Sequence, residues 1–238
     1  MPKLQDLDVM ILCGGLGTRL QSLDPNTPKV MMKFEDRPFL DIVIQHLKGQ
    51  GLKRFILCTG HKSHWIEDYY KQNDPGVEIV YSWEEKPLGT GGAIKHARGH
   101  LKSDPFFVLN GDCYCDVNFQ HFLDFHLEKG KIATIVASYV EDSKDFGTLD
   151  IDDQGQIHAF LEKQDRGSQY INAGRYCFNQ VVFDLMPDAD KFSIEFDVFP
   201  KIVEQGLYGF KHEGEFFDIG TPERFKKATE FFKDGKNS

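Results

Sequence analysis

A glycine-rich segment near the N-terminus carries the residue types that bind phosphate. Residues 12–20 read Leu-Cys-Gly-Gly-Leu-Gly-Thr-Arg-Leu and follow a run of apolar residues. Glycine lets a chain turn sharply after a strand, and successive backbone N–H groups in such a turn form a concavity that holds anions. Arg19 and Lys29 add positive charge to the same region. The segment therefore predicts a polyphosphate site, and a tight packing turn is the alternative.

The spacing of this segment differs from that of the two commonest phosphate loops. A dinucleotide fingerprint would have a third glycine where Leu20 stands, and a P-loop would have Gly-Lys-Ser/Thr.

Three other segments contain glycines or carboxylates, and the first two of them follow apolar runs. Residues 84–93 read Glu-Glu-Lys-Pro-Leu-Gly-Thr-Gly-Gly-Ala, which lets a flat ligand approach the backbone and favours an anion where the next helix begins. Asp112 follows Asn110-Gly111, and Asp218 lies in Phe-Asp-Ile-Gly-Thr at 217–221. One or two carboxylates of this kind can hold Mg²⁺ on a phosphate. A turn or a helix cap is the alternative for each aspartate.

Other polar residues give weaker signals. Glu162 and Lys163 form a pair of a kind that is usually solvated, and Asn172 with Gly174 interrupts a strand-like run, which indicates a ligand approach or a β-bulge. The nine histidines form no catalytic pattern. Cys113 and Cys115 have no partners at zinc-site spacing, and no base is identifiable for a cysteine nucleophile.

The elements that must position these residues alternate in the first half of the chain. Strands are predicted at 8–13, 54–58, 77–82 and 106–110, and helices at 39–50, 63–72, 90–101 and 119–129. This alternation predicts an α/β fold with a mainly parallel sheet, whose ligands bind beyond the carboxyl ends of the strands.

The second half reads differently. A strand at 132–140, a hairpin from 147–151 to 156–160 and a strand at 170–178 are followed by helices at 179–186, 195–205 and 222–232. Nothing resembles a linker, so we expect a single domain over 1–238, with an α/β half followed by a mixed lobe.

Composition narrows the choice of ligand and location. The 238 residues include 28 Lys and Arg against 37 Asp and Glu, a formal net charge of −9, which argues against a nucleic-acid partner. No secretory signal and no bilayer-length apolar run are present, so no membrane partner is expected. The five cysteines are read as reduced core residues, and the predicted location is cytoplasmic.

Taken together and in this order, the segments resemble the sugar-1-phosphate nucleotidyltransferases over nearly the whole chain. The resemblance implies a Rossmann-like, mainly parallel (mixed) central sheet flanked by helices, with a small sugar-binding lobe. It divides the domain into a nucleotide-binding half at about 8–130 and a sugar-phosphate-binding half at about 131–238. The implied reaction joins a nucleoside triphosphate to a sugar 1-phosphate and releases pyrophosphate, without an enzyme nucleophile.

The same resemblance implies the site residues. Catalytic roles fall to Arg19, Lys29, Asp112 and Lys163. Nucleotide-binding positions are Leu12, Gly14, Gly15, Gly17, Thr18, Glu84, Pro87, Leu88, Gly89, Thr90 and Gly91. Sugar-phosphate-binding positions are Asn110, Gly111, Gly147, Glu162, Lys163, Asn172 and Glu195. The implied cofactor is Mg²⁺, held by Asp112 and Asp218, and a homo-oligomer is a further expectation.

Two departures bear on the subfamily. Many relatives have proline at the positions of Ser22 and Val30, but Lys29 itself is present. The Gly-Gly-Leu-Gly-Thr-Arg-Leu-x-Ser form at 14–22 looks most like the guanylyltransferases that act on D-glycero-D-manno-heptose 1-phosphate, which favours GTP and synthesis of GDP-heptose for surface glycans.

Other readings stay open. Within the class, UTP, CTP or dTTP and another sugar 1-phosphate, such as glucose, mannose or N-acetylmuramate 1-phosphate, are alternatives. A glycosyltransferase that uses a nucleotide-sugar would share the α/β fold and an acidic metal motif, although its diphosphate donor needs no cationic clamp for pyrophosphate. A catalytically silent nucleotide-sugar sensor is the third reading.

Overall fold

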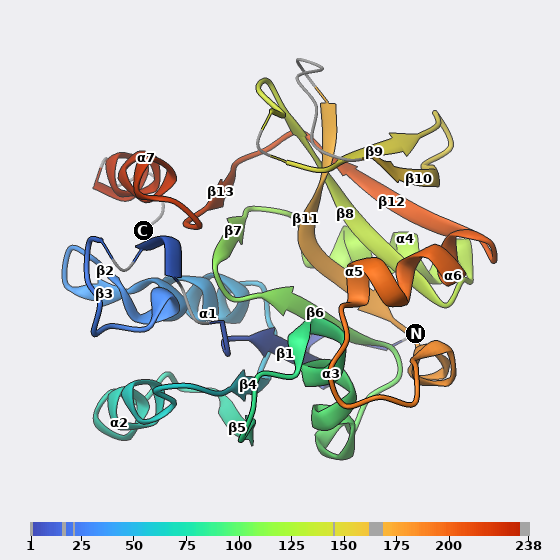
Figure 1. The fold of residues 1–238 in the computed structure, drawn as a ribbon. Helices are drawn as coiled ribbons and strands as arrows, with labels where there is room; N and C mark the ends of the chain where they lie inside the picture. The colour runs from blue at the N-terminus through green and yellow to red at the C-terminus, as the bar shows by residue number, and fades with distance from the viewer. Residues whose placement is uncertain (1, 16–17, 21, 145, 162–168, 234–238) are drawn as a thin grey trace.

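The first four long strands form a parallel sheet, as predicted. The computed structural model describes residues 2–15, 18–20, 22–144, 146–161 and 169–233. The main sheet has nine strands in the order β5-β4-β1-β6-β11-β8-β12-β10-β9 (Figure 1). Its parallel part consists of β1 (Asp8–Leu12), β4 (Arg54–Thr59), β5 (Glu78–Trp83) and β6 (Phe106–Asn110).

The remaining strands make the sheet mixed. They are β8 (Ala133–Val140), β9 (Thr148–Ile151), β10 (Gln156–Leu161), β11 (Gln169–Phe178) and β12 (Leu207–His212). Strand β11 runs antiparallel to both β6 and β8, which joins the mixed part to the parallel part, and β9 and β10 form the predicted hairpin. The expected α/β fold with a mixed central sheet flanked by helices is confirmed.

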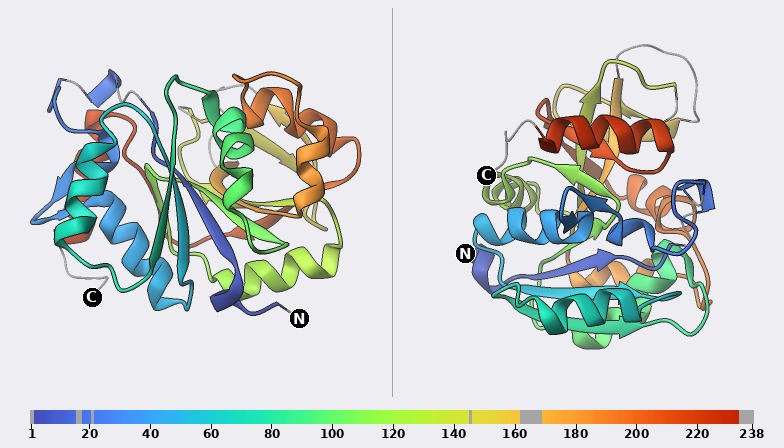
Figure 2. Two further views of the ribbon diagram at one scale, coloured as in Figure 1. Left: turned by 90° about the horizontal axis from the view of Figure 1, so that it is seen from below. Right: turned by 90° about the vertical axis from the view of Figure 1, so that its left-hand side faces the viewer.

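Helices cover both faces of the sheet (Figure 2). One apolar core lies beneath α1 (Phe39–Gly49), α2 (His64–Gln72), α4 (Phe119–Lys129) and α7 (Pro222–Lys233). The opposite core lies beneath α3 (Gly89–His96), α5 (Ile194–Asp197) and α6 (Phe199–Val203). In α1, Leu40, Val43, Ile44 and Leu47 are all buried, so the sequence periodicity identified the face that packs on the sheet.

Three predicted helices differ from the structure. The 90–101 helix ends as α3 at His96 and continues as a 3-10 helix over Ala97–His100, and 179–186 is a 3-10 helix at Gln180–Leu185 rather than an α-helix. Pro187 disfavours the α conformation at the residue before it, so the segment at 180–185 cannot extend into a longer α-helix. The 195–205 helix is divided at Val198 into α5 and α6, because Pro200 inside one continuous helix would clash with the carbonyl of Phe196.

Two small sheets and the strand β12 were missed. Strand β2 (Lys33–Phe34) pairs with β3 (Arg37–Pro38), and β7 (Cys113–Cys115) pairs with β13 (Phe216–Asp218). Strands of two or three residues are too short to show a hydrophobic period. The β7–β13 pair nevertheless matters most for the site, because it joins the two segments that carry Asp112 and Asp218.

In the part of the chain that the structure describes, no helix combines the length and apolar character needed to cross a membrane.

Candidate active site

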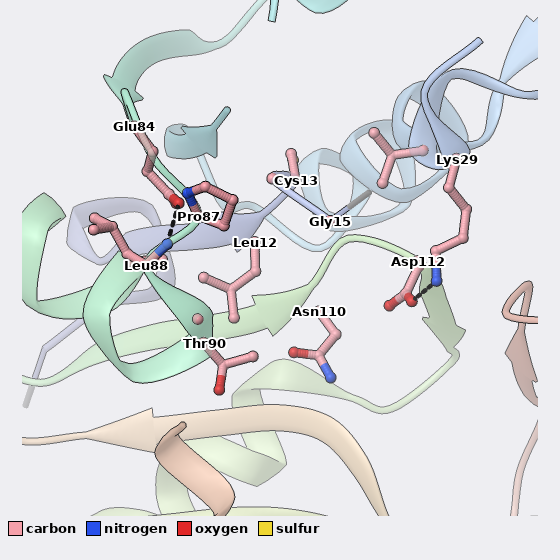
Figure 3. A pocket seen from close by; sticks show the side chains of 14 residues that line it. Leu12, Cys13, Gly15, Lys29, Glu84, Pro87, Leu88, Thr90, Asn110 and Asp112 are labelled. Carbon is pink, nitrogen blue, oxygen red and sulfur yellow. Dashed lines mark hydrogen bonds and ion pairs between the residues drawn. The ribbon is translucent and has the colours of Figure 1, made fainter. Parts of the chain in front are cut away.

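The predicted residues gather where the direction of chain progression across the sheet reverses. From β1 the chain adds β4 and β5 on one side and then returns to add β6 on the other, so the carboxyl ends of β1 and β6 border a crevice. A cavity of about 300 Å³ occupies this position (Figure 3). It is lined by Leu12, Cys13, Gly14, Gly15, Lys29, Val30, Glu84, Pro87, Leu88, Gly89, Thr90, Ala93, Asn110 and Asp112.

The first glycine segment forms one wall of this cavity. The N–H of Cys13 still bonds the carbonyl of Cys58 at 2.9 Å, so the chain leaves the sheet only after this residue. A Cβ at Gly14 would stand 3.4 Å from Glu84 Oε1, whereas one at Gly15 would meet nothing within 4 Å. Gly14 therefore allows close packing, and Gly15 leaves open space for a ligand. Gly17, also predicted to bind nucleotide, lies outside the described residues.

Glu84 brings a buried carboxylate to the cavity wall beside Gly14. Only 8% of Glu84 is exposed, and its Oε2 accepts a hydrogen bond from the N–H of Leu88 at 3.3 Å. Burial raises the pKa of the Glu84 carboxyl above its usual value, although the bond from Leu88 opposes the shift. A carboxylate held in this way retains the capacity to accept further hydrogen bonds from a ligand.

The second glycine segment begins α3 and packs against the loop before α5. Gly89 has a φ of +73°, and a Cβ there would stand 2.5 Å from the carbonyl oxygen of Phe192. Gly91 donates to that same carbonyl at 3.1 Å, and a Cβ at Gly91 would collide with the Phe192 ring. Gly91 is thus buried behind the cavity wall, and its described contacts are packing contacts.

Thr90 connects the cavity to α5. Its hydroxyl donates to Glu195 Oε2 at 2.7 Å and accepts from the N–H of Ile194 at 2.9 Å. The hydroxyl of Ser193 donates to the same carboxylate oxygen of Glu195 at 2.6 Å. Glu195 therefore holds the start of α5 against α3 at the rim of the cavity.

Lys29 and Asp112 form an ion pair at the other end of the cavity (Figure 3). Lys29 begins a 3-10 helix after Pro28, and Asp112 follows β6. Burial would raise the pKa of Asp112, but the Lys29 ammonium outweighs this effect and holds that pKa below its usual value. Asp112 is therefore a carboxylate at neutral pH, and a cation capable of contacting phosphate lies beside it.

Asp218 is brought beside the Asp112 segment by the β7–β13 pair. Asp218 is the register partner of Cys113, and the N–H of Ile219 donates to the carbonyl oxygen of Asp112 at 3.0 Å. Arg224, in the first turn of α7, pairs with Asp218 Oδ2 at 2.9 Å. Each candidate metal ligand thus has its own cationic partner.

The donor set fits Mg²⁺. Two carboxylates from adjacent strand ends are what magnesium commonly takes from a protein when phosphate and water supply the remaining oxygens. Within the described ranges, no group of three or more His, Cys, Asp or Glu residues could hold a metal alone. Asp112 and Asp218 would therefore hold a metal together with oxygens from a phosphate ligand and water.

Arg19 is exposed and lies on the Asp218 side. Its Nη2 is 3.4 Å from the position that a Cβ on Gly220 would take. It belongs to the 3-10 helix Thr18–Leu20, so the glycine segment places this cation near the second carboxylate.

The residues predicted to bind the sugar phosphate are only partly described. Asn110 lines the cavity, and its buried Oδ1 has no hydrogen-bond partner in the described structure. Asn172 donates to the hydroxyl of Tyr176 at 3.1 Å, and the charge of Glu195, after burial, raises the pKa of that same phenol. Asn172 thus contacts Tyr176 directly, whereas Glu195 is hydrogen-bonded to Thr90 and Ser193.

The remaining positions are less informative. Gly111 packs beneath β1, since a Cβ there would stand 2.8 Å from the Leu12 carbonyl oxygen, and Gly147 is exposed before β9. Glu162 and Lys163 lie outside the described residues.

Sequence reasoning missed three cavity residues and two cations. The cavity residues that were not predicted are Cys13, Val30 and Ala93, which lie in sequence near predicted site residues. The two cations that no motif marks are Arg175 and Arg224. Arg224 lies in the first turn of α7, where its N–H donates to Thr221 Oγ1 at 3.3 Å and so caps the helix.

Comparison with known proteins agrees with this geometry. The chain is 39% identical over 222 residues to the mannose-1-phosphate guanylyltransferase catalytic subunit beta of Drosophila melanogaster, which covers 91% of this chain and 60% of the relative. It is 34% identical over 223 residues to the D-glycero-alpha-D-manno-heptose 1-phosphate guanylyltransferase of Aneurinibacillus thermoaerophilus, covering 93% and 96%. The chain thus spans about three-fifths of the length of the Drosophila relative.

A solved structure is similar over almost its full length. It is HddC from Yersinia pseudotuberculosis complexed with GMP-PN, with a TM-score of 0.86 and 37% identity over 95% of this chain and 99% of the other. Residues 8–235 also match the sequence model of the nucleotidyl transferase family. With the strand-end cavity, its glycine segments and its paired carboxylates, these matches show that the chain belongs to the nucleotidyl transferase family.

Proposed function

We propose that this protein transfers GMP from GTP to a sugar 1-phosphate of manno configuration and releases pyrophosphate. D-glycero-α-D-manno-heptose 1-phosphate is the first candidate acceptor, which would make GDP-heptose for surface glycans. Two observations support the proposal: two similar proteins are guanylyltransferases, and the similar solved structure is a complex with GMP-PN. The division into a nucleotide-binding half and a sugar-phosphate-binding half is part of the same proposal.

The observation that carries the choice of GTP is the buried carboxylate of Glu84 in the cavity wall. Guanine presents two neighbouring donors, N1–H and the 2-amino group, on one edge. A carboxylate that already accepts one bond from the backbone can accept both, because its two oxygens together offer about four lone-pair sites. Uracil and thymine offer a single N–H between two carbonyl oxygens. A carboxylate would disfavour these bases, because its oxygens would face those carbonyl acceptors.

The phosphate chemistry needs charge neutralisation and alignment, since a sugar-phosphate oxygen attacks the α-phosphorus directly. In this proposal Gly14 and Gly15 receive the triphosphate, Lys29 contacts the α-phosphate, and Arg19 stabilises the leaving pyrophosphate. Asp112 and Asp218 would hold Mg²⁺, which supplies further positive charge to the phosphate oxygens. Lys163 is proposed to bind the phosphate of the acceptor.

The acceptor sugar is inferred from the chemistry shared by the relatives. Mannose and D-glycero-D-manno-heptose have the same ring configuration and differ beyond C5, so one set of ring contacts serves both. The unpartnered Oδ1 of Asn110 is suited to accept from a sugar hydroxyl, and Asn172 and Glu195 supply further polar atoms near Tyr176. Mannose 1-phosphate is the second candidate, on the 39% identity to a mannose-1-phosphate guanylyltransferase.

A pyrophosphate-release matrix tests the proposal. GTP, ITP, UTP, CTP and dTTP are each combined with heptose, mannose, glucose and N-acetylmuramate 1-phosphates in the presence of Mg²⁺. We expect release with GTP and the heptose phosphate, and weaker release with mannose 1-phosphate. Release only with another nucleotide or only with a gluco-configured acceptor would contradict the assignment. Sugar transfer from a GDP-sugar without pyrophosphate release would indicate the glycosyltransferase reading.

The role of Glu84 has its own test. ITP lacks the 2-amino group of guanine, so a site that pairs with this group prefers GTP by about tenfold. E84Q is expected to lose most of that preference in kcat/KM. E85Q is the matched control, because Glu85 is exposed and does not line the cavity. An unchanged GTP-to-ITP ratio in E84Q would remove guanine recognition from this residue.

A further inference from the structure

Arg175 is a fully buried cation directly behind the segment that carries Asp112. It is 1% exposed and is among the largest fully buried side chains. Its Nη1 donates to the carbonyl oxygens of Asn110 at 3.0 Å and Gly174 at 3.1 Å, and its Nη2 donates to the carbonyl oxygen of Cys113. The guanidinium therefore binds the main chain on both sides of Asp112.

A local irregularity in β11 places the side chain there. The pairing of β11 with β8 shifts register between Asn172 and Tyr176, and Gly174 within this shift has a φ of +65°. The N–H of Gly174 donates to Asn172 Oδ1 at 2.9 Å, and a Cβ on Gly174 would stand 2.5 Å from Asn110 Nδ2. The Asn-Ala-Gly bulge thus seats β11 tightly against the end of β6, where Arg175 is the register partner of Leu109.

Burying the Arg175 guanidinium costs free energy unless other groups in the protein compensate for its lost hydration. Within the described ranges no carboxylate forms an ion pair with Arg175, and a buried cation is tolerated only where its N–H groups find acceptors. Carbonyl oxygens fill that role here.

We propose that Arg175 is a positioning residue that fixes the turn at residues 110–113, and with it the Asp112 carboxylate. Arg175 is not among the residues that line the cavity, and it contacts the cavity-lining Asn110 only through the main-chain carbonyl, so it acts through the main chain. The inference rests on the proposed function for its kinetic consequence, whereas the clamp on the turn stands on the contacts alone. Displacement of a reacting group by about 1 Å is enough to lower turnover strongly.

The test compares R175M, which keeps the volume of the chain but removes the donors, with R175K, which restores one charged donor. H126L is the control, because His126 is also 1% exposed and bonds Thr134 and Asn179, away from the cavity. The measurements are thermal melting, amide hydrogen exchange of residues 106–116, Mn²⁺ affinity by paramagnetic resonance without nucleotide, and kcat and KM.

In R175M we expect amide exchange in the turn to be at least about tenfold faster and Mn²⁺ affinity to be several-fold weaker. We also expect kcat to fall at least tenfold while the KM for GTP changes less than about threefold. R175K should recover part of each loss, and H126L should lower the melting temperature without these local effects. Wild-type exchange at 110–113 in R175M, or the same changes in H126L, would overturn the proposal.

Two outcomes are kept distinct. If the wild-type protein releases no pyrophosphate from GTP with any sugar phosphate, the proposed function fails, and exchange together with Mn²⁺ affinity still decides the clamp. If R175M does not fold, the exchange and Mn²⁺ affinity of R175K decide the proposal, and wild-type values in R175K would overturn it.

Discussion

The main-chain N–H of Ile219 donates a hydrogen bond to the carbonyl oxygen of Asp112 at 3.0 Å. This one bond ends the short β7–β13 pair and sets Asp218 beside the segment that follows β6. Two carboxylates that are distant in the sequence are therefore carried by neighbouring segments, with Asp112 in the strand-end cavity and Asp218 in the lining of a separate pocket. Each is neutralised by a different cation, Lys29 or Arg224.

The two carboxylates are expected to act together. D112N and D218N should each lower turnover by about 10²–10³, since each removes one well-placed electrostatic stabiliser. Both should also weaken Mn²⁺ binding, measured by titration in the absence of nucleotide. D150N, at an exposed position in β9, is the control and should retain both properties. Tight Mn²⁺ binding by D218N would exclude Asp218 as a metal ligand.

Loss of Lys29 should destabilise the protein in a pH-dependent way. The folded-state pKa of Asp112 is lowered, so the stabilisation from its ion pair is present at neutral pH and is lost as the pH falls through that pKa. K29M leaves a partly buried carboxylate without its ammonium, so its deficit in unfolding free energy should be largest near pH 7 and should shrink below about pH 4. Urea unfolding across this range measures the effect.

The matched control for Lys29 is K53M, which removes an exposed lysine just before β4. Its stability should follow the wild type at every pH. K29M should also lose about two orders of magnitude in turnover, because Lys29 is proposed to contact the α-phosphate. A deficit in K29M that is constant with pH would mean that the pair contributes no net stability.

Preference for GTP over ITP should decline in acid. Burial raises the pKa of Glu84, so the carboxylate that accepts from guanine is protonated at a higher pH than an exposed glutamate. The kcat/KM ratio of GTP to ITP should therefore fall between pH 7.5 and 5, and should be flat in E84Q. A ratio that rises toward acid would contradict ionised Glu84 as the acceptor.

Gly91 is expected to be required for packing. A Cβ at this position would collide with the Phe192 ring, and the main chain of Ile194 is 3.1 Å away. G91A should lose about 1–3 kcal/mol of unfolding free energy through overpacking. G99A is the control, because a Cβ there meets nothing within 4 Å. The double variant G91A/F192A should be more stable than additivity of the single variants predicts, and strict additivity would argue that the two residues do not compete for space.

Much of the parallel half of the fold was predictable from local pattern. The predicted strand at 106–110 and helix at 119–129 match β6 and α4 to the residue, since apolar runs and amphipathic periodicity are recorded in consecutive residues. The glycine segments could be placed at strand ends for the same reason. Most of the residues proposed for the nucleotide line one cavity, including Gly14, Glu84 and Leu88.

Contacts between distant segments could not be predicted in this way. The β7–β13 pair is three residues long on each side and has no period of its own, yet it sets Asp218 beside the Asp112 segment. The buried Arg175 looked like an ordinary polar residue within a strand-like run. Only the bulge at Gly174 and the turn after β6 make its burial tolerable, because they present carbonyl oxygens to its guanidinium.

The sequence by itself determined that glycine-rich turns follow buried strands, that Lys29 and Arg19 lie close to one of them, and that acidic residues follow others. These are properties of neighbours along the chain, and local sterics and hydrophobic patterning fix them. The tertiary structure alone decided which cation pairs with which carboxylate and which glycines serve packing. Such pairings depend on the order of strands in the sheet and on short strands that pair across long sequence separations. The contacts that stabilise these short strands join distant residues, so no local sequence pattern records them.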